Sequence, residues 1–380
     1  MKIVFIVNAF PPAIDGVGDY SFNLIKELCK VGYQIDVYCK ETEKITNALP
    51  GSRFFPIIKS WDRKGMKGLL QKLNEAPPDW IILQYVPYSF QKWGMPFRLI
   101  PFLIQCRFAY RVKVMITFHE LANGKGLRNP KYFIPAISQF GIGYSLALTA
   151  NSVITSNKVV NKELRVAGKK RTIIPIGSNF SIEPKMRYEL INPYSITIVS
   201  FGFSFSRNYY LYDIAEELNN QGYSINWIIM GKTESQLQKK LYIKGDINIQ
   251  FTGVIDDHQV NVLMSQADIF LLQEDVNIRG IGGISTKSGI SIAAFSSAFP
   301  ILATKGNLTD ETYFRHLENC YLVNNNVPEI INGLKELIAD GDLREGIGRG
   351  AHDTFLKHFN WETVGNRYSR IINRTNFNGK

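Results

Sequence analysis

The sequence predicts an α/β protein with two Rossmann-like domains, because apolar segments typical of buried strands alternate with helical segments in two successive series. The first series runs from residues 2–8 to residues 172–175, and the second begins at 195–201. A stretch rich in turn residues, 176–193, separates them. The chain has 380 residues, 45% of them apolar, which is enough for two hydrophobic cores. We therefore expect two domains that face each other across a cleft.

The first series opens with a βαβ unit. Residues 2–8 are rich in Ile, Val and Phe, as expected of a strand that is buried on both faces. A loop of turn residues follows at 10–20, and the apolar spacing over 21–30 is helical. The next strand is expected at 34–39. Further strands of this series are expected at 80–85, 114–118, 152–155 and 172–175.

The second series repeats the alternation. It predicts a strand at 195–201, a helix at 209–219 and a strand at 225–230. Two short strands are expected at 248–252 and 269–272. The last segment with helical apolar spacing covers 359–372.

The stretch 274–306 has the pattern of a loop, a helix and a strand. A helix that begins near Ser285 would point unpaired N–H groups and its positive dipole end at a ligand. With a lysine beside these groups, a diphosphate is the ligand that the turn favours. The alternative is an ordinary capped helix that fills the core. The candidate binding residues in this turn are Ser285, Thr286, Lys287, Ser288 and Gly289.

Other candidates follow predicted strands, because open parallel sheets bind ligands beyond the carboxyl ends of their strands. Each has a purely structural alternative: a flexible turn for a glycine, a satisfied core position for a histidine, a helix cap for a glutamate and a solvated loop charge for an arginine. The residues at these positions are Gly16, Gly18, His119, Glu120, Arg207, Lys232 and Gly253.

A nicotinamide-dinucleotide site is the obvious rival for the first loop. The loop reads Gly16-x-Gly18-x-x-Ser21 and lacks the third glycine of that fingerprint. The second strand ends at Lys40 rather than at an acid that could bind a ribose. The match to a dinucleotide site is therefore weak.

The net charge of +11 is unevenly distributed. Residues 1–190 contain 27 Lys and Arg against 13 Asp and Glu, or +14, whereas residues 191–380 contain 17 against 20, or −3. The basic half favours an anionic partner: nucleic acid, a phospholipid surface or a phosphorylated substrate. A general solubility bias is the alternative.

Cysteine and acidic residues indicate neither a disulfide framework nor a metal site. The four cysteines lie far apart without a CxxC or Cys/His cluster, which fits a reducing cytoplasm. No Asp-x-Asp follows a predicted strand, so we expect no metal and no other cofactor. The first nine residues are too short to span a membrane and lack a cleavage site, so they are expected to form a strand.

Six motifs in order resemble those of the family-4 glycosyltransferases of the GT-B fold. They are Pro11-Pro12-x-x-x-Gly16-x-Gly18-Asp-Tyr, Thr117-Phe-His119-Glu120, Ile174-Pro-Ile-Gly177, Phe201-Gly202 with Arg207, Ala293-Ala-Phe-Ser-Ser-Ala-Phe-Pro300-Ile-Leu-Ala-Thr304, and Phe359-Asn-Trp361. The resemblance covers nearly the whole chain. It implies an N-terminal acceptor domain at 1–177, a linker at 178–193 and a C-terminal nucleotide-sugar domain at 194–362, with a helix at 363–380 that packs back on the first domain.

The resemblance implies transfer of a sugar from a nucleotide-diphosphate sugar to an acceptor hydroxyl, with retention of anomeric configuration. His119 would then contact the donor sugar, Glu120 would orient the acceptor, and Arg207 with Lys287 would stabilise the leaving diphosphate. The paired glutamates of the family fall on Ser285 and Ala293. These departures mean that the grip on the donor is reorganised or lost.

The basic half suggests where the acceptor lies. Cations lie beside aromatic and leucine residues that are expected to be exposed in two stretches, 61–72 and 97–113, which suits an interface with anionic lipid. We therefore expect a saccharide or lipid-linked acceptor of the cell envelope, at the cytoplasmic face of a membrane. Two ordinary surface helices are the alternative.

Three rival functions remain at this point. An epimerase or phosphorylase would need an added acid–base set or a cofactor lysine, and neither is evident. A non-catalytic subunit that supports an active transferase would explain Ser285 and Ala293. A nucleic-acid binder is not expected, because the chain lacks a stacking platform and a helix-turn-helix signal.

Overall fold

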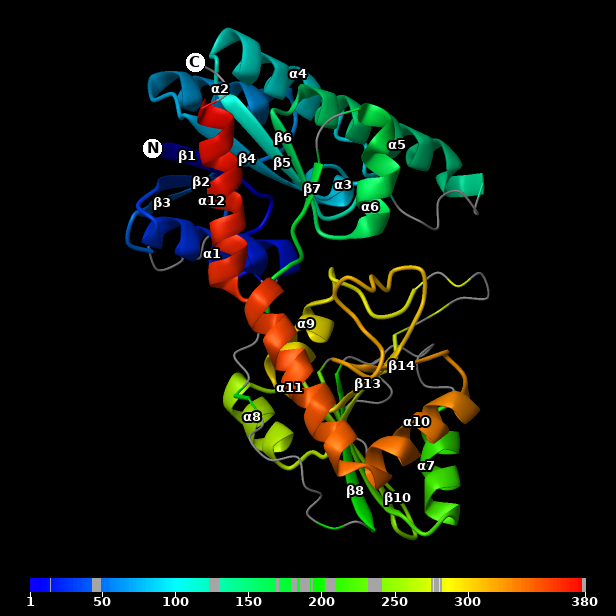
Figure 1. The fold of residues 1–380 in the computed structure, drawn as a ribbon. Helices are drawn as coiled ribbons and strands as arrows, with labels where there is room; N and C mark the ends of the chain where they lie inside the picture. Colours follow the sequence, from blue (N-terminus) through cyan, green and yellow to red (C-terminus); the bar gives the residue numbers. More distant parts are fainter. Residues whose placement is uncertain are drawn as a thin grey trace. The chain divides into compact units, whose positions relative to one another are not determined.

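The chain folds into two compact α/β units (Figure 1). Unit 1 comprises Met1–Pro175 and Trp361–Lys380, and unit 2 comprises Ile176–Asn360. The computed structural model describes residues 1–13, 15–42, 49–122, 130–168, 171–178, 183–184, 192, 194–201, 210–231, 241–274, 276, 280 and 282–377, and every structural statement below concerns these residues. The linker expected at 178–193 lies mostly outside them.

Unit 1 is built on a seven-stranded parallel sheet in the order β3-β2-β1-β4-β5-β6-β7. Its central strands are buried on both faces, which explains their continuous apolar sequences. The strands are β1 (Lys2–Ile6), β2 (Gln34–Lys40), β3 (Ser52–Ile58), β4 (Trp80–Tyr85), β5 (Lys113–Phe118), β6 (Ser152–Thr155) and β7 (Arg171–Ile173).

Helices cover both faces of this sheet. One apolar core joins the sheet to α2, α4, α5 and α6, whereas α1 packs with α12 on the opposite face. The helices are α1 (Gly16–Lys30), α2 (Arg63–Glu75), α3 (Pro87–Phe90), α4 (Leu99–Ile104) with its π-helical continuation η1 (Gln105–Ala109), α5 (Pro130–Thr149), α6 (Lys158–Glu163) with the 3-10 turn η2 (Leu164–Ala167), and α12 (Trp361–Phe377).

Unit 2 has a second seven-stranded sheet, in the order β10-β11-β9-β8-β12-β13-β14, with β10 antiparallel at one edge. The strands are β8 (Ser195–Phe201), β9 (Ser224–Met230), β10 (Leu241–Lys244), β11 (Ile247–Gly253), β12 (Ile269–Leu272), β13 (Ile301–Thr304) and β14 (Tyr321–Val323). The helices are α7 (Leu211–Asn220), α8 (Asp257–Ser265), α9 (Gly289–Ser296), α10 (Val327–Ala339) and α11 (Gly341–His358).

Each face of the second sheet has its own core. One core includes residues of α7 and α10, and the other includes residues of α8 and α9. The prediction of two Rossmann-like α/β domains is therefore confirmed.

Two predicted helix starts are wrong. The first helix begins at Gly16 rather than at 21, because the Asp15 side chain accepts a hydrogen bond from the Gly18 N–H at 2.7 Å and caps it. The helix expected near Ser285 begins at Gly289, because Ser288 is its cap and accepts from the Ser291 N–H.

The helix α12 is joined to unit 1 by buried hydroxyl groups. The Tyr368 hydroxyl lies 2.9 Å from the Tyr20 hydroxyl on α1 and 2.8 Å from Thr117 Oγ1 on β5. Further along the helix, the Ser369 hydroxyl lies 2.9 Å from the hydroxyl of Tyr33. Buried hydroxyls without partners are costly, so these bonds favour one position of α12 on the sheet.

The α1–α12 contact is close enough to require a glycine. A Cβ atom at Gly365 would lie 2.7 Å from the Cβ of Glu27 on α1. By contrast, Gly346 on α11 is exposed, and a Cβ there would meet nothing within 4 Å.

We predict that the same substitution has opposite effects at these two glycines. Gly365→Ala should lower the free energy of unfolding by about 1–3 kcal/mol through overpacking. Gly346→Ala should raise it by about 0.5–1 kcal/mol, since alanine favours a helix interior. Urea denaturation of the two variants and the parent protein measures both changes. Equal effects of the two substitutions would contradict the close packing of α12.

Candidate functional site

His119 lies at the carboxyl end of β5 and is held by groups from two other elements, β4 and α1. Its Nε2 atom is 2.8 Å from Oε1 of Gln84 on β4, and its backbone N–H donates to the Tyr85 carbonyl at 3.1 Å. The ring of Tyr20, on α1, meets the imidazole edge-on with centroids 4.8 Å apart. The predicted strand-end position of His119 is therefore where the structure places it.

The imidazole of His119 is neutral at ordinary pH, because burial lowers its pKa to about 4. A neutral imidazole has one donor and one acceptor nitrogen. In the assignment that satisfies the Gln84 carbonyl, Nε2–H donates to Gln84 and Nδ1 is left as an acceptor. His119 can therefore accept a hydrogen bond from a hydroxyl, but it carries no proton to donate from Nδ1.

The Tyr20 side chain that contacts His119 is itself held by residues of α12. Trp361, the first residue of α12, contacts Tyr20 with ring centroids 5.2 Å apart. Burial raises the pKa of Tyr20 well above its usual value and that of Tyr368 to about 12. Both phenols are therefore neutral, and their hydroxyls act only as hydrogen-bonding groups.

Sequence analysis missed these partners of His119. Gln84 is buried in a strand that is otherwise apolar, and its Nε2 atom has no hydrogen-bond partner among the described residues. A polar residue in such a strand was the available signal. Tyr20 and Tyr368 gave no comparable signal, since they meet only through the packing of α12 on α1.

The other predicted residues of unit 1 have separate surroundings. Glu120 follows His119 and is exposed. Gly16 and Gly18 lie in the first turn of α1 rather than in a loop. A Cβ at Gly18 would lie 2.9 Å from the Ala9 carbonyl oxygen, so Gly18 permits a close approach within the protein itself. Gly16 is exposed, with open space beside it.

In unit 2, the turn before α9 forms a compact bonded structure. Ser285 and Thr286 are buried, whereas Lys287 is exposed. The Lys287 N–H donates to Ser285 Oγ at 3.3 Å, and the Ser288 N–H donates to the Ser285 carbonyl at 3.1 Å. The N–H groups of Lys287 and Ser288 are thus occupied within the turn. The first two N–H groups of α9, at Gly289 and Ile290, are the ones that a helix start leaves unpaired.

A carboxylate that the sequence analysis did not single out lies at this turn. Ser288 Oγ donates to Glu274 Oε1 at 3.2 Å. The backbone of Glu274 is fixed by Thr304 at the end of β13, whose Oγ1 accepts from the Glu274 N–H at 2.8 Å and donates to the Glu274 carbonyl at 2.7 Å. The available signal was an acid two residues after the buried strand ending at Leu272.

The remaining predicted residues of unit 2 have different outcomes. Gly253 ends β11 with a φ of 69°, a conformation that favours glycine, and its carbonyl accepts from the Gly231 N–H at 3.0 Å. Ala293, at the second glutamate position of the resemblance, is completely buried in α9. Arg207 and Lys232 lie outside the described residues. Each unit therefore holds its own cluster, His119 in unit 1 and the α9 turn in unit 2.

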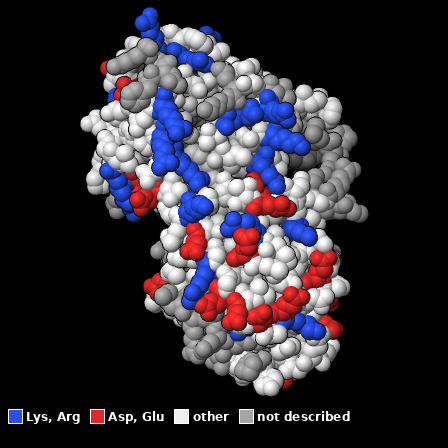
Figure 2. Space-filling view, in the orientation of Figure 1, with Lys and Arg blue, Asp and Glu red and all other residues white. Residues whose placement is uncertain are grey.

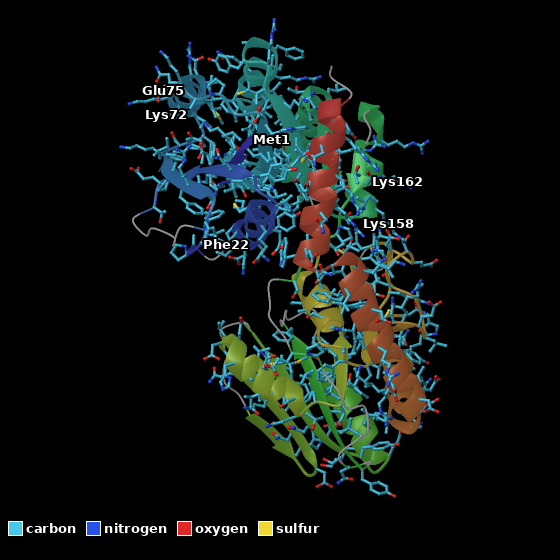
Figure 3. All side chains as sticks on the ribbon, turned by 60° about the vertical axis from the view of Figure 1, so that its left-hand side comes forward. Met1, Phe22, Lys72, Glu75, Lys158 and Lys162 are labelled. Atoms are coloured by element: carbon cyan, nitrogen blue, oxygen red, sulfur yellow. The ribbon has the colours of Figure 1, made fainter. Side chains whose placement is uncertain are left out.

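A groove of about 720 Å³ lies between the end of β3 and α2 in unit 1. Lys59, Lys64 and Lys72 line it, and Lys72 pairs with Glu75 at 2.8 Å (Figure 3). The leucines Leu69 and Leu73 of α2 are buried, so the expectation of exposed leucines in the stretch 61–72 is wrong for Leu69.

Within the described part of the chain, no group of three or more His, Cys, Asp or Glu could hold a metal ion. Among the described helices, none is long and apolar enough to cross a membrane.

Comparison with solved structures identifies the architecture. The chain resembles sucrose-phosphate synthase from Thermosynechococcus elongatus, with a TM-score of 0.68 and 16% identity over 100% of both chains. It also resembles HepE from Anabaena in complex with UDP and glucose, with a TM-score of 0.64 and 14% identity over 98% of this chain and 100% of that chain. This chain has the GT-B fold.

A third GT-B structure is WaaG, a glycosyltransferase involved in lipopolysaccharide biosynthesis. It matches with a TM-score of 0.58 and 12% identity over 97% of this chain and 99% of WaaG. No family model and no curated protein matches the sequence. At these identities the likeness establishes the fold of the chain.

We predict that His119 makes stability depend on pH. Its pKa rises from about 4 in the folded protein to 6.5 when unfolded, so the unfolded chain binds the proton first as pH falls. The free energy of unfolding should therefore decrease between pH 6.5 and 4, by up to roughly 3 kcal/mol at 1.36 kcal/mol per pKa unit. Urea denaturation at several pH values measures the loss.

The His119→Gln variant should lack this component of the pH dependence. His258→Gln, a substitution at an exposed histidine of α8, should keep it. If the parent protein and the His119→Gln variant lose stability equally between pH 6.5 and 4, the folded protein does not lower the pKa of His119.

Proposed function

We propose that this protein is a glycosyltransferase that moves a sugar from a nucleotide-diphosphate sugar to an acceptor hydroxyl, with retention of configuration, in the synthesis of a cell-envelope polysaccharide or glycolipid. The observation that carries the proposal is the α9 turn, which contains Lys287 and in which Ser288, the cap of α9, donates to Glu274 at the carboxyl ends of β12 and β13. Similarity to HepE, which was crystallised with UDP and glucose, supports a nucleotide-sugar donor.

The proposed role of the α9 turn is to bind the leaving diphosphate. Negative charge develops on that group as the bond to the sugar breaks, and fixed cations and N–H groups lower the barrier by stabilising it. Lys287 supplies an exposed ammonium, and Gly289 with Ile290 supplies N–H groups at the positive end of the α9 dipole. Arg207 and Lys232 are proposed to add further positive charge.

Glu274 is proposed to replace the glutamates that the sequence lacks at 285 and 293. A carboxylate accepts hydrogen bonds from sugar and ribose hydroxyls but repels phosphate. Ser288 and Thr304 hold Glu274 beside the α9 turn, where its carboxylate is proposed to accept a hydrogen bond from a hydroxyl of the donor.

His119 is proposed to bind the donor sugar as a neutral acceptor. Because its pKa is lowered to about 4, it does not act as a general acid at neutral pH. Its Nδ1 atom can accept a bond from a sugar hydroxyl, and Glu120 beside it is proposed to orient the acceptor. The groove between β3 and α2, with its three lysines, suits an anionic part of that acceptor.

A second candidate function is a non-catalytic subunit that binds an active transferase. The complete burial of Ala293 and the near-complete burial of Ser285 favour it, because neither position presents a carboxylate to a donor. The two functions differ in whether the α9 turn binds a nucleotide.

We predict that at least one of the nucleoside diphosphates UDP, GDP, ADP and CDP raises the melting temperature by binding at the α9 turn. Lys287→Ala should weaken binding of that nucleotide by roughly 10- to 100-fold, the size of a lost hydrogen bond to a charged group. Glu274→Gln should weaken binding of the nucleotide sugar. A thermal-shift titration gives the affinities, and release of free sugar from the donor gives the activity.

The matched control is Lys335→Ala, which removes an exposed lysine from α10 in the same unit and should bind the nucleotide as the parent protein does. No response to any nucleotide would favour the non-catalytic subunit. A response that survives in Lys287→Ala would place the nucleotide elsewhere.

A further inference from the structure

The helices α4, η1 and α5 of unit 1 expose large apolar side chains along one surface, which we call the α4–α5 face. Phe108 and Ile134 are 66% and 73% exposed, and the other members are 43–54% exposed. We define the face by Phe97, Ile104, Phe108, Ile134, Ile137 and Leu148. Scattered single apolar residues are normal on a protein surface, but a contiguous group marks a binding surface.

The exposed residues form two helical stripes. Ile104 and Phe108 lie four residues apart on α4 and η1 with Phe97 in the turn before α4, and Ile134, Ile137 and Leu148 fall on one side of α5. The inner sides of these helices are different residues, such as Phe102 and Leu146, which are buried in the core. The outer stripes are therefore not needed to fill the core of unit 1.

The two stripes lie next to each other. α4 packs against α5, and the Arg107 guanidinium of η1 donates to the Thr149 carbonyl at 2.5 Å, at the end of α5. Weaker contacts of the same nitrogen reach the carbonyls of Leu148 and Ala150 at 3.4 and 3.5 Å. Arg107 thus bonds the carbonyls at the end of α5. Because Phe108 is the next residue along the chain, this contact brings Phe108 near Leu148.

The charge of this region is one-sided. Between Asp79 and Glu163, Glu120 is the only acidic residue in the sequence. Lys92, Arg98 and Arg111 are exposed and lie close in sequence to the apolar residues, and Arg98 also lies near the carboxylate of Asp62 at the start of α2. Figure 2 shows lysine and arginine side chains spread over unit 1, whereas most of the visible acidic side chains lie on unit 2.

Aromatic and aliphatic side chains with a cationic border are the composition of surfaces that lie in the interface of an anionic bilayer. Trp93, which is 47% exposed next to this face, is of the residue type enriched at the level of lipid headgroups. A protein partner of neutral or basic surface would not complement the lysines and arginines, and a second copy would bring two basic faces together.

We propose that the α4–α5 face docks unit 1 on an anionic phospholipid bilayer, with α4, η1 and α5 lying in the interface and their outer stripes inserted among the lipids. This proposal extends the proposed function by naming the membrane as the partner that presents the acceptor. It does not depend on sugar transfer, because the docking surface shares no residue with the α9 turn or with His119.

Vesicle sedimentation without nucleotide or acceptor tests the proposal. The full chain should pellet with vesicles of phosphatidylcholine and phosphatidylglycerol at a 7:3 ratio at low salt, and weakly with phosphatidylcholine alone. The double variant Phe108→Glu/Ile134→Glu should bind the anionic vesicles at least 10-fold more weakly. Lys92→Gln/Arg98→Gln should weaken binding to anionic vesicles and reduce its dependence on salt.

Val254→Glu is the matched control, because Val254 is 80% exposed but belongs to unit 2; it should bind vesicles like the parent protein. Circular dichroism and the melting temperature show that each variant is folded. Binding of the Phe108→Glu/Ile134→Glu variant equal to that of the parent would overturn the proposal. Failure of the parent protein to pellet with the anionic vesicles would also overturn it. In that case, loss of self-association in the Phe108→Glu/Ile134→Glu variant, measured by sedimentation velocity, would indicate that the face binds a second copy of the chain.

Lipid contact is also measurable at one side chain. Phospholipids brominated on their acyl chains should quench tryptophan fluorescence of the parent protein, and Trp93→Phe should remove most of the quenching. Quenching that persists in Trp93→Phe would place the docking surface elsewhere. Vesicle binding without any nucleotide response would leave the docking proposal intact and remove the transferase, so the two proposals fail separately.

Discussion

The buried hydroxyl groups of Tyr20, Thr117 and Tyr368 are the constraint on which the organisation of unit 1 depends. They come from α1, β5 and α12, and each finds its hydrogen-bond partner within the group. If α12 left the sheet, Tyr20 and Thr117 would lose the hydroxyl that satisfies them. The chain must therefore return from unit 2 to unit 1, and in doing so it brings the Trp361 and Tyr20 rings into contact beside His119.

The fold was largely predictable, because strands buried on both faces have continuous apolar sequences. What was missed follows from the same physics. The strand β3 lies at the sheet edge and carries Pro56, a residue that argues against a strand, so the sequence did not indicate it. The starts of α1 and α9 were misplaced because each is set by one cap, Asp15 or Ser288, in a stretch with several candidate caps.

The candidate site was predictable only in part. The position of His119 followed from the strand before it, but its neutral state depends on burial, to which the fold contributes residues such as Tyr20 from a distant part of the sequence. At the α9 turn, the segment was predictable but its hydrogen-bond partners were not. There the sequence indicated the segment, whereas the geometry shows that Glu274 joins it and that the turn uses two of its own N–H groups. Local patterns locate such segments, but burial and partners decide their chemistry.

The layering of unit 1 separates its two surfaces. The helices α4 and α5 cover one face of the sheet, and α1 with α12 cover the other. Gln84 and Thr117, which lie opposite each other on neighbouring strands, face the α12 side, and His119 lies at the carboxyl edge with them. A bilayer held against the outer stripes of α4 and α5 would leave that edge open. The proposed membrane docking and the proposed sugar binding at His119 would therefore use different residues of unit 1.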